Sequence, residues 1–134
     1  MELDPSQFAR QFLAKGNRVI GGVRNQDGAK HLADLGNGAV TILPLDVSSS
    51  ESIAEWAAAV RRTTDHVDVL INNAGVLIYT SFDSVTAEEL MACFSVNAIG
   101  PLIVAQQLHK QGLIGGREAS LIGNVTSKVT SSTE

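Results

Sequence analysis

The stretch that most constrains the fold is residues 67–75, whose sequence is VDVLINNAG. Its first five residues are mostly β-branched or aliphatic, which is typical of a strand buried on both faces of a parallel sheet. Asn72 and Asn73 carry amides that can satisfy backbone groups where the strand ends. Ala74 and Gly75 then remove side-chain bulk from a predicted turn, so that a ligand can lie on the backbone. Ligands of open α/β sheets bind beyond the carboxyl ends of strands, so this turn is the predicted position of a site.

The remaining chain alternates strand and helix patterns, as parallel βαβ units do. Strands are predicted at residues 18–23, 40–45, 67–71 and 119–125. Helices are predicted to begin at Asp4, at about Ala29, at Ser48 and at Thr86. Ser48 and Thr86 are each followed three residues later by glutamate, which is the spacing of a capping box. The sequence therefore predicts a single α/β domain over residues 1–134.

Two of these helices carry further information. In the helix expected after Ser48, the apolar residues Ile53, Trp56, Ala57 and Val60 recur at helical spacing, so they are predicted to face the core. The last helical pattern runs from Thr86 to Leu108, and Gly100-Pro101 is expected to bend or break it.

Composition excludes several classes of function. The net charge is −4 and the basic residues are scattered, so neither a nucleic acid nor a membrane surface is an expected partner. No apolar run approaches the roughly 20 residues of a membrane helix, and no signal peptide is visible. The single cysteine, Cys93, suits a reducing compartment, so a cytoplasmic location is expected. His31, His66 and His109 lack metal-ligand spacing and are expected at the surface, so no metal site is predicted.

The VDVLINNAG stretch resembles the central strand and NNAG motif of the short-chain dehydrogenase/reductase family, whose members are NAD(P)-dependent oxidoreductases with a Rossmann fold. The resemblance extends from about Phe8 to Ser127. Order and spacing most resemble the carbonyl-reductase-like branch that includes the C-factor and sniffer-type proteins. The resemblance implies a doubly wound parallel sheet and hydride transfer between NADP(H) and a small carbonyl or alcohol substrate.

The resemblance also implies the residues that bind the cofactor. Arg24, in Val23-Arg24-Asn25, stands where the family's NAD-using members usually have an acid, and a guanidinium there favours the 2′-phosphate of NADP(H) over NAD(H). Asp46 and Val47 resemble the family's adenine-contacting pair, and Asn73, Ala74 and Gly75 belong to the cofactor-binding NNAG motif. Two alternatives remain open: a solvated surface arginine at position 24, and an aspartate at position 46 that caps the following helix.

Two residues resemble catalytic positions of the family. Asn97, in FSVNAIGP, matches a helix-borne asparagine that distorts its helix so that a main-chain carbonyl holds a water in a proton relay. Ser127 matches the serine that hydrogen-bonds the substrate carbonyl, although Ser131 and Ser132 lie close by. The alternatives are an asparagine at an ordinary kink and a serine in a routine turn.

Two motifs of the family are missing from this sequence. None of the twelve glycines forms the glycine-rich phosphate loop that precedes the family's first helix, and Asp4 would place a negative charge beside those phosphates. The Tyr-x-x-x-Lys pair is also missing, because the only tyrosine, Tyr79, is followed at the fourth place by Asp83. The 134 residues alone are therefore expected to be inactive.

The missing first strand has a structural consequence. In the family's strand order it lies between the strands at Val19 and Val69, so a gap of two strand spacings, roughly 10 Å, is expected there. The two facing edges would be unpaired and open to self-association. The expected fold is thus a partial Rossmann-like, doubly wound parallel sheet that lacks its first strand and C-terminal part, followed by a disordered tail at residues 128–134.

Three functional interpretations remain open from the sequence. The first is a short-chain reductase whose sequence is cut at both ends. The second is a cofactor-binding or interaction protein without catalysis. The third is a truncated gene product with no stable fold of its own.

Overall fold

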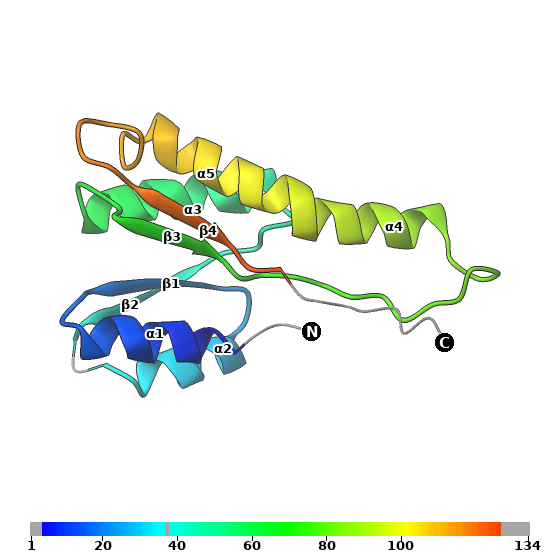
Figure 1. The fold of residues 1–134 in the computed structure, drawn as a ribbon, viewed down its shortest axis with the longest axis horizontal. Helices are drawn as coiled ribbons and strands as arrows, with labels where there is room; N and C mark the ends of the chain where they lie inside the picture. The colour runs from blue at the N-terminus through cyan, green and yellow to red at the C-terminus, as the bar shows by residue number, and fades with distance from the viewer. Residues whose placement is uncertain (1–3, 37, 127–134) are drawn as a thin grey trace.

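A computed structural model of the chain describes residues 4–36 and 38–126 (Figure 1). Helices and strands alternate along most of this part of the chain. Their order is α1 (Pro5–Ala14), β1 (Val19–Val23), α2 (Gln26–Ala33), β2 (Val40–Pro44), α3 (Ser50–Thr63), β3 (Val69–Asn72), α4 (Ala87–Phe94), the π-helix η1 (Ser95–Ile99), α5 (Gly100–Lys110) and β4 (Leu121–Asn124). The expected α/β class is confirmed. Ser127 and the tail predicted at residues 128–134 lie outside the described residues.

The described strands form two separate two-stranded sheets rather than one. β1 and β2 are parallel, in a register from Val19 opposite Val40 to Val23 opposite Pro44. β3 and β4 are also parallel, from Val69 opposite Leu121 to Asn72 opposite Asn124. Figure 1 shows the two pairs set apart from each other, with β1 and β3 on the sides that face each other. The interruption of the sheet predicted between the strands at Val19 and Val69 is therefore present.

An apolar core lies between α3, α5 and β3. The stripe predicted on α3, from Ile53 to Val60, is buried as expected. It packs with Leu70 of β3 and with Val104 and Leu108 of α5. α1 and α2 lie along the other sheet, formed by β1 and β2 (Figure 1).

Helix starts follow the predicted caps in two cases and depart from them in two. The Asp4 side chain accepts the Ser6 N–H at 2.9 Å, and Thr86 and Glu89 form the predicted reciprocal capping box. α3, by contrast, is capped by Ser49 rather than Ser48, because Asp46 holds both the N–H and the hydroxyl of Ser48. The capping box predicted at Ser48 is therefore wrong.

α2 also begins earlier than predicted. It starts at Gln26 instead of at about Ala29, and Gly28, expected to bound the helix, lies inside it. The cause is Asn25, whose side-chain oxygen accepts the Gly28 N–H at 3.0 Å and so caps the helix three residues upstream of its expected start.

Of the bend or break expected at Gly100-Pro101, the break does not occur. α4, η1 and α5 run as one helix from Ala87 to Lys110, and the wider π-turn accommodates the local irregularity, with the Gly100 N–H donating to the Ser95 carbonyl. Because the helix continues, its 24 residues are long and apolar enough to cross a membrane, contrary to the expectation from the sequence. Length and composition are weak evidence for a membrane span, since core helices meet the same criterion.

Candidate functional site

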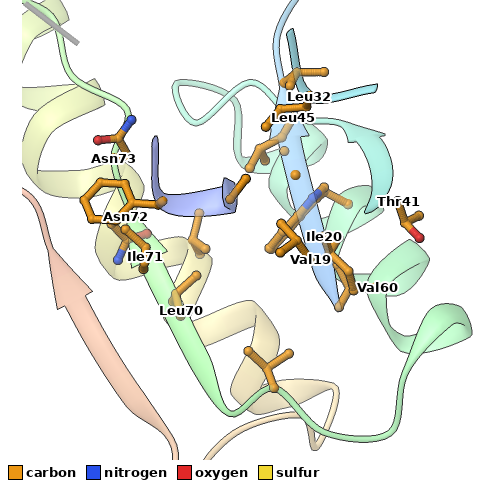
Figure 2. Close-up of a pocket in the computed structure, with 18 of the residues that line it drawn as sticks. Val19, Ile20, Leu32, Thr41, Leu45, Val60, Leu70, Ile71, Asn72 and Asn73 are labelled. Carbon is orange, nitrogen blue, oxygen red and sulfur yellow. The ribbon is translucent and has the colours of Figure 1, made fainter. Parts of the chain in front are cut away.

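A cavity of about 540 Å³ lies between β1 and β3 and is lined by both strands along their whole length (Figure 2). Its volume is in the range of small-molecule sites. At the carboxyl ends of the strands it is lined by five of the predicted cofactor residues, namely Arg24, Asp46, Val47, Asn73 and Ala74. Gly75, predicted with them, is not among the lining residues. The structure thus brings together residues from the ends of β1, β2 and β3.

The NNAG segment has a different conformation from the predicted one. Residues 73–80 form no turn, and the chain continues beyond β3 until a turn at residues 82–84 (Figure 1). Gly75 does not have the positive φ that would require a glycine. The Asn72 amide donates to Asn124 Oδ1 at 2.9 Å, so it joins β3 to β4. The predicted turn is therefore wrong, since side chains from other elements hold this segment extended.

Asn97 is the side chain that holds the extended segment. Its Oδ1 accepts the Val76 N–H at 2.8 Å, and its Nδ2 donates to the Val76 carbonyl at 2.8 Å. The amide therefore pairs with Val76 as a neighbouring strand would. Asn97 also lies within the π-turn, so the predicted helix distortion is present. Asn97 does not line the cavity itself, but its partner Val76 does.

Asp46 organises the connection between β2 and α3. Its Oδ1 accepts the Ser48 N–H at 2.9 Å and the Ser48 hydroxyl at 2.6 Å. The Asp46 N–H donates to the Ser52 hydroxyl at 2.9 Å. The hydrogen bonds from Ser48 lower the pKa of Asp46 below 3.8, and the positive charge of Arg24 adds to this effect. The carboxylate thus orders the residues before the helix while it borders the cavity.

This lowered pKa predicts an acid-sensitive contribution to stability. Because the folded pKa is depressed, the contribution is present above pH 3.8 and is lost as the pH falls through the folded value. We expect the melting temperature to decline more steeply below about pH 4 in the wild type than in Asp46→Asn. Melting curves between pH 2.5 and 7 measure this difference, with Ser48→Ala as a second variant that removes the hydroxyl donor. Parallel curves for wild type and Asp46→Asn would refute the assignment.

Arg24 follows β1 directly and lines the cavity. Its side chain is exposed, and the next residue, Asn25, caps α2. The charge of Arg24 lies close enough to Asp46, which follows β2, to affect the pKa of that carboxyl, and the sequence alone could not show this proximity. A cation and an anion therefore border the same end of the cavity.

Two of the lining residues that were not predicted as part of a site have a buried ring nitrogen without a hydrogen-bond partner. Trp56, expected as a core anchor, is buried as predicted, but its Nε1 has no hydrogen-bond partner. His66, expected at the surface, has a side chain only 22% exposed, with Nε2 3.7 Å from an Asp68 carboxylate oxygen. The sequence signal that could have marked Trp56 is its indole N–H, because a buried indole N–H usually finds a hydrogen-bond partner. His31 and His109 are exposed, as expected.

Other candidates lie outside this cavity. Tyr79 is 88% exposed. Within residues 4–36 and 38–126, no group of three or more histidine, cysteine, aspartate or glutamate side chains is arranged to hold a metal ion.

Comparisons with known proteins agree with this arrangement. The family model described as short chain dehydrogenase matches residues 6–133. A short-chain dehydrogenase of Aspergillus ruber, fogD, is 30% identical over 100 residues, which are 74% of this chain and 34% of that protein. A sorbitol dehydrogenase of Cereibacter sphaeroides is 27% identical, over 86% of this chain and 45% of its own length. The chain thus spans a third to a half of these relatives.

Solved structures show the same fold. A short-chain dehydrogenase from Streptomyces avermitilis superposes with a TM-score of 0.83 at 28% identity, over 94% of this chain and 46% of that one. An NADPH-bound carbonyl reductase from chicken fatty liver superposes with a TM-score of 0.74 at 27% identity, over 82% of this chain and 47% of that one. With a family match over nearly its whole length and these parallel strands, the chain belongs to the short-chain dehydrogenase family.

Proposed function

We propose that this protein is an NADP(H)-dependent oxidoreductase of the carbonyl-reductase-like branch, which transfers hydride between the cofactor and a small carbonyl or alcohol substrate in the cytoplasm. The observation that carries the proposal is the convergence of Arg24, Asp46 and Asn73 from three strand ends on one cavity. Neither a nucleic acid nor a membrane is part of the proposal.

The adenosine half of the cofactor fits the residues present. Arg24 supplies the cation that a 2′-phosphate needs, because its guanidinium can form bidentate charge-assisted hydrogen bonds. Asp46 retains a second carboxylate oxygen that can accept from an adenine amino group, and Val47 offers an apolar contact. Asn73 and Ala74 of the NNAG segment line the cavity and would face the adenosine, whereas Gly75 does not line it.

The diphosphate does not fit the start of α1 in the same way. Asp4 already accepts both the N–H and the hydroxyl of Ser6, and these hydrogen bonds lower the pKa of Asp4. The charged carboxylate of Asp4 therefore occupies the N-terminus of α1, where a helix could otherwise bind a phosphate. This observation favours a second candidate function, a cofactor-binding or interaction protein without catalysis.

The catalytic part of the proposal rests on Asn97 and Ser127. The cofactor supplies the hydride when it is bound. Asn97 fixes the backbone of Val76 beside the cavity. Asn97 also lies in the π-turn, and a widened turn is what a proton relay through a main-chain carbonyl of this helix would need. Ser127, outside the described residues, would hydrogen-bond the substrate carbonyl. The resemblance assigns proton transfer to a Tyr-x-x-x-Lys pair, so we propose that these 134 residues alone do not turn over substrate.

The test of the proposal separates the 2′-phosphate from the rest of the nucleotide. We expect the chain to bind adenosine 2′,5′-bisphosphate more tightly than 5′-AMP, as measured by isothermal titration calorimetry. Arg24→Ala should weaken binding of the bisphosphate about 10- to 100-fold, the range expected for a hydrogen bond to a charged group, and leave 5′-AMP unchanged.

Arg18 provides a matched control for this experiment. It lines the same cavity, but it precedes β1 whereas Arg24 follows it. Arg18→Ala should therefore leave the affinity for both nucleotides unchanged. Equal losses in the two variants would mean that the cavity attracts phosphate only through its general charge, and would refute the assignment of Arg24.

A further inference from the structure

The N-terminus of α1 lies at the same edge of the sheets as the candidate cofactor residues. The short connection of residues 15–18 reverses the chain between α1 and β1, so the two elements run antiparallel. Figure 1 shows α1 beginning at the end of the sheets where β1 and β3 end. Arg24 follows β1 and Asp46 follows β2 at that edge. The residues at the start of α1 can therefore influence which nucleotide binds there.

The backbone donors at this N-terminus are already in use. A helix N-terminus can bind a phosphate because its first N–H groups have no partner within the helix. In α1 the Ser6 N–H donates to Asp4 Oδ1 at 2.9 Å, and the Gln7 N–H donates to the Asp4 carbonyl at 3.1 Å. Pro5, at the first helical position, has no N–H. The N–H groups of residues 5–7 are thus either bonded to Asp4 or missing.

A second hydrogen bond fixes the Asp4 carboxylate in this place. The hydroxyl of Ser6 donates to Asp4 Oδ2 at 2.5 Å, and Ser6 itself is buried. The two hydrogen bonds from Ser6 favour the ionised carboxylate and hold the pKa of Asp4 below its usual 3.8. At neutral pH the N-terminus of α1 therefore carries a full negative charge of its own, oriented by both carboxylate oxygens.

We propose that Asp4 is a specificity-determining residue: the site takes adenosine nucleotides that carry a 2′-phosphate but no 5′-diphosphate. Asp4 excludes the diphosphate in two ways, because it occupies the Ser6 N–H and because its charge repels a second anion. The ligand class is a 2′-phosphorylated mononucleotide rather than a dinucleotide, which favours nucleotide binding without catalysis. This inference rests on the proposed binding of the 2′-phosphate by Arg24, and not on hydride transfer.

Two nucleotides that differ only at the 5′ position test the inference. The probes are adenosine 2′-phosphate and adenosine 2′-phosphate 5′-diphosphate, and isothermal titration calorimetry measures both affinities for the 134-residue chain. We expect the wild type to bind the 5′-diphosphate no more tightly than adenosine 2′-phosphate. Asp4→Asn removes the charge and keeps a capping oxygen, because asparagine and aspartate are equally good N-caps. This variant should bind the 5′-diphosphate about tenfold more tightly than wild type, with unchanged affinity for adenosine 2′-phosphate.

Asp34→Asn provides the matched control. Asp34 is the exposed C-cap residue of α2, and its replacement changes the net charge by the same amount as Asp4→Asn. Because α2 connects the parallel strands β1 and β2, it ends at the opposite edge of the sheet. Asp34→Asn should therefore leave the ratio of the two affinities unchanged. Amide chemical shifts locate the effect: the 5′-diphosphate should shift the Ser6 and Gln7 resonances in Asp4→Asn but not in wild type.

Four results would overturn the inference: tighter binding of the 5′-diphosphate than of adenosine 2′-phosphate by wild type, no gain in Asp4→Asn, an equal gain in Asp34→Asn, or unshifted Ser6 and Gln7 resonances in Asp4→Asn. In each case, binding of adenosine 2′-phosphate that depends on Arg24 would still support the proposed function, so the two failures are distinguishable. Failure of wild type to bind either nucleotide would overturn both.

Discussion

Leu108→Ala is expected to lower the free energy of unfolding by about 2–5 kcal/mol, the range for large-to-small substitutions at fully buried sites. Leu108 is 0% exposed and packs in the cluster formed by α3, α5 and β3. Its loss removes apolar contacts and leaves a cavity between α5 and α3, where few side chains can move to fill the space. Urea unfolding followed by circular dichroism measures the change.

The same helix offers a matched control. Leu102 lies on α5 as well, but it is 68% exposed. Leu102→Ala is therefore expected to change the free energy of unfolding by no more than about 0.5 kcal/mol, as exposed substitutions usually do. If both variants lost similar stability, α5 would have to bury its other face as well, and the packing of this helix would be wrong.

Local sequence patterns predicted much of this fold, because each element contains its own signals. The caps at Asp4 and Thr86 depend on side chains within one turn of the helix that they start. The apolar stripe on α3 depends only on helical period. The interruption between β1 and β3 followed from a family resemblance, since no local pattern reports which strands are neighbours.

The predictions that failed depended on competition between residues. The spacing of Ser48 and Glu51 fits a capping box, but Asp46 binds Ser48 first and Ser49 becomes the cap. Gly100-Pro101 favours a bend or a break, and the structure excludes the break, because a π-turn keeps the helix continuous. In each case a second partner, invisible to the local pattern, had the better geometry.

Some features of the candidate site could likewise be predicted from the sequence, and others could not. The positions of Arg24, Asp46 and Asn73 at strand ends could be predicted, because parallel strands bring their carboxyl ends to one edge. The bonds of Asn97 to Val76 could not, because they join residues 21 positions apart through a side chain. Those bonds explain why Gly75 is held in an extended segment and does not reach the cavity.

Gly100→Ala is expected to be the second most destabilising of these changes. A Cβ at this position would lie 2.7 Å from the Val47 carbonyl oxygen and 3.1 Å from the Val47 Cβ. Overpacking of this kind costs about 1–3 kcal/mol, of which the higher helix propensity of alanine offsets up to about 1 kcal/mol. Because the contact is with backbone, relief requires a shift of the segment that contains Asp46, so affinity for adenosine 2′,5′-bisphosphate should fall as well.

Gly116 provides the matched control for this last prediction. A Cβ added there meets no atom within 4 Å, and its φ is not in the positive range, so Gly116→Ala should leave stability and nucleotide binding unchanged. Urea unfolding and calorimetry of the two variants separate steric contact from the general effect of replacing a glycine. A Gly100→Ala variant as stable as wild type would mean that α5 can move away from Val47. The carboxyl end of the cavity would then be adjustable rather than fixed by the π-turn.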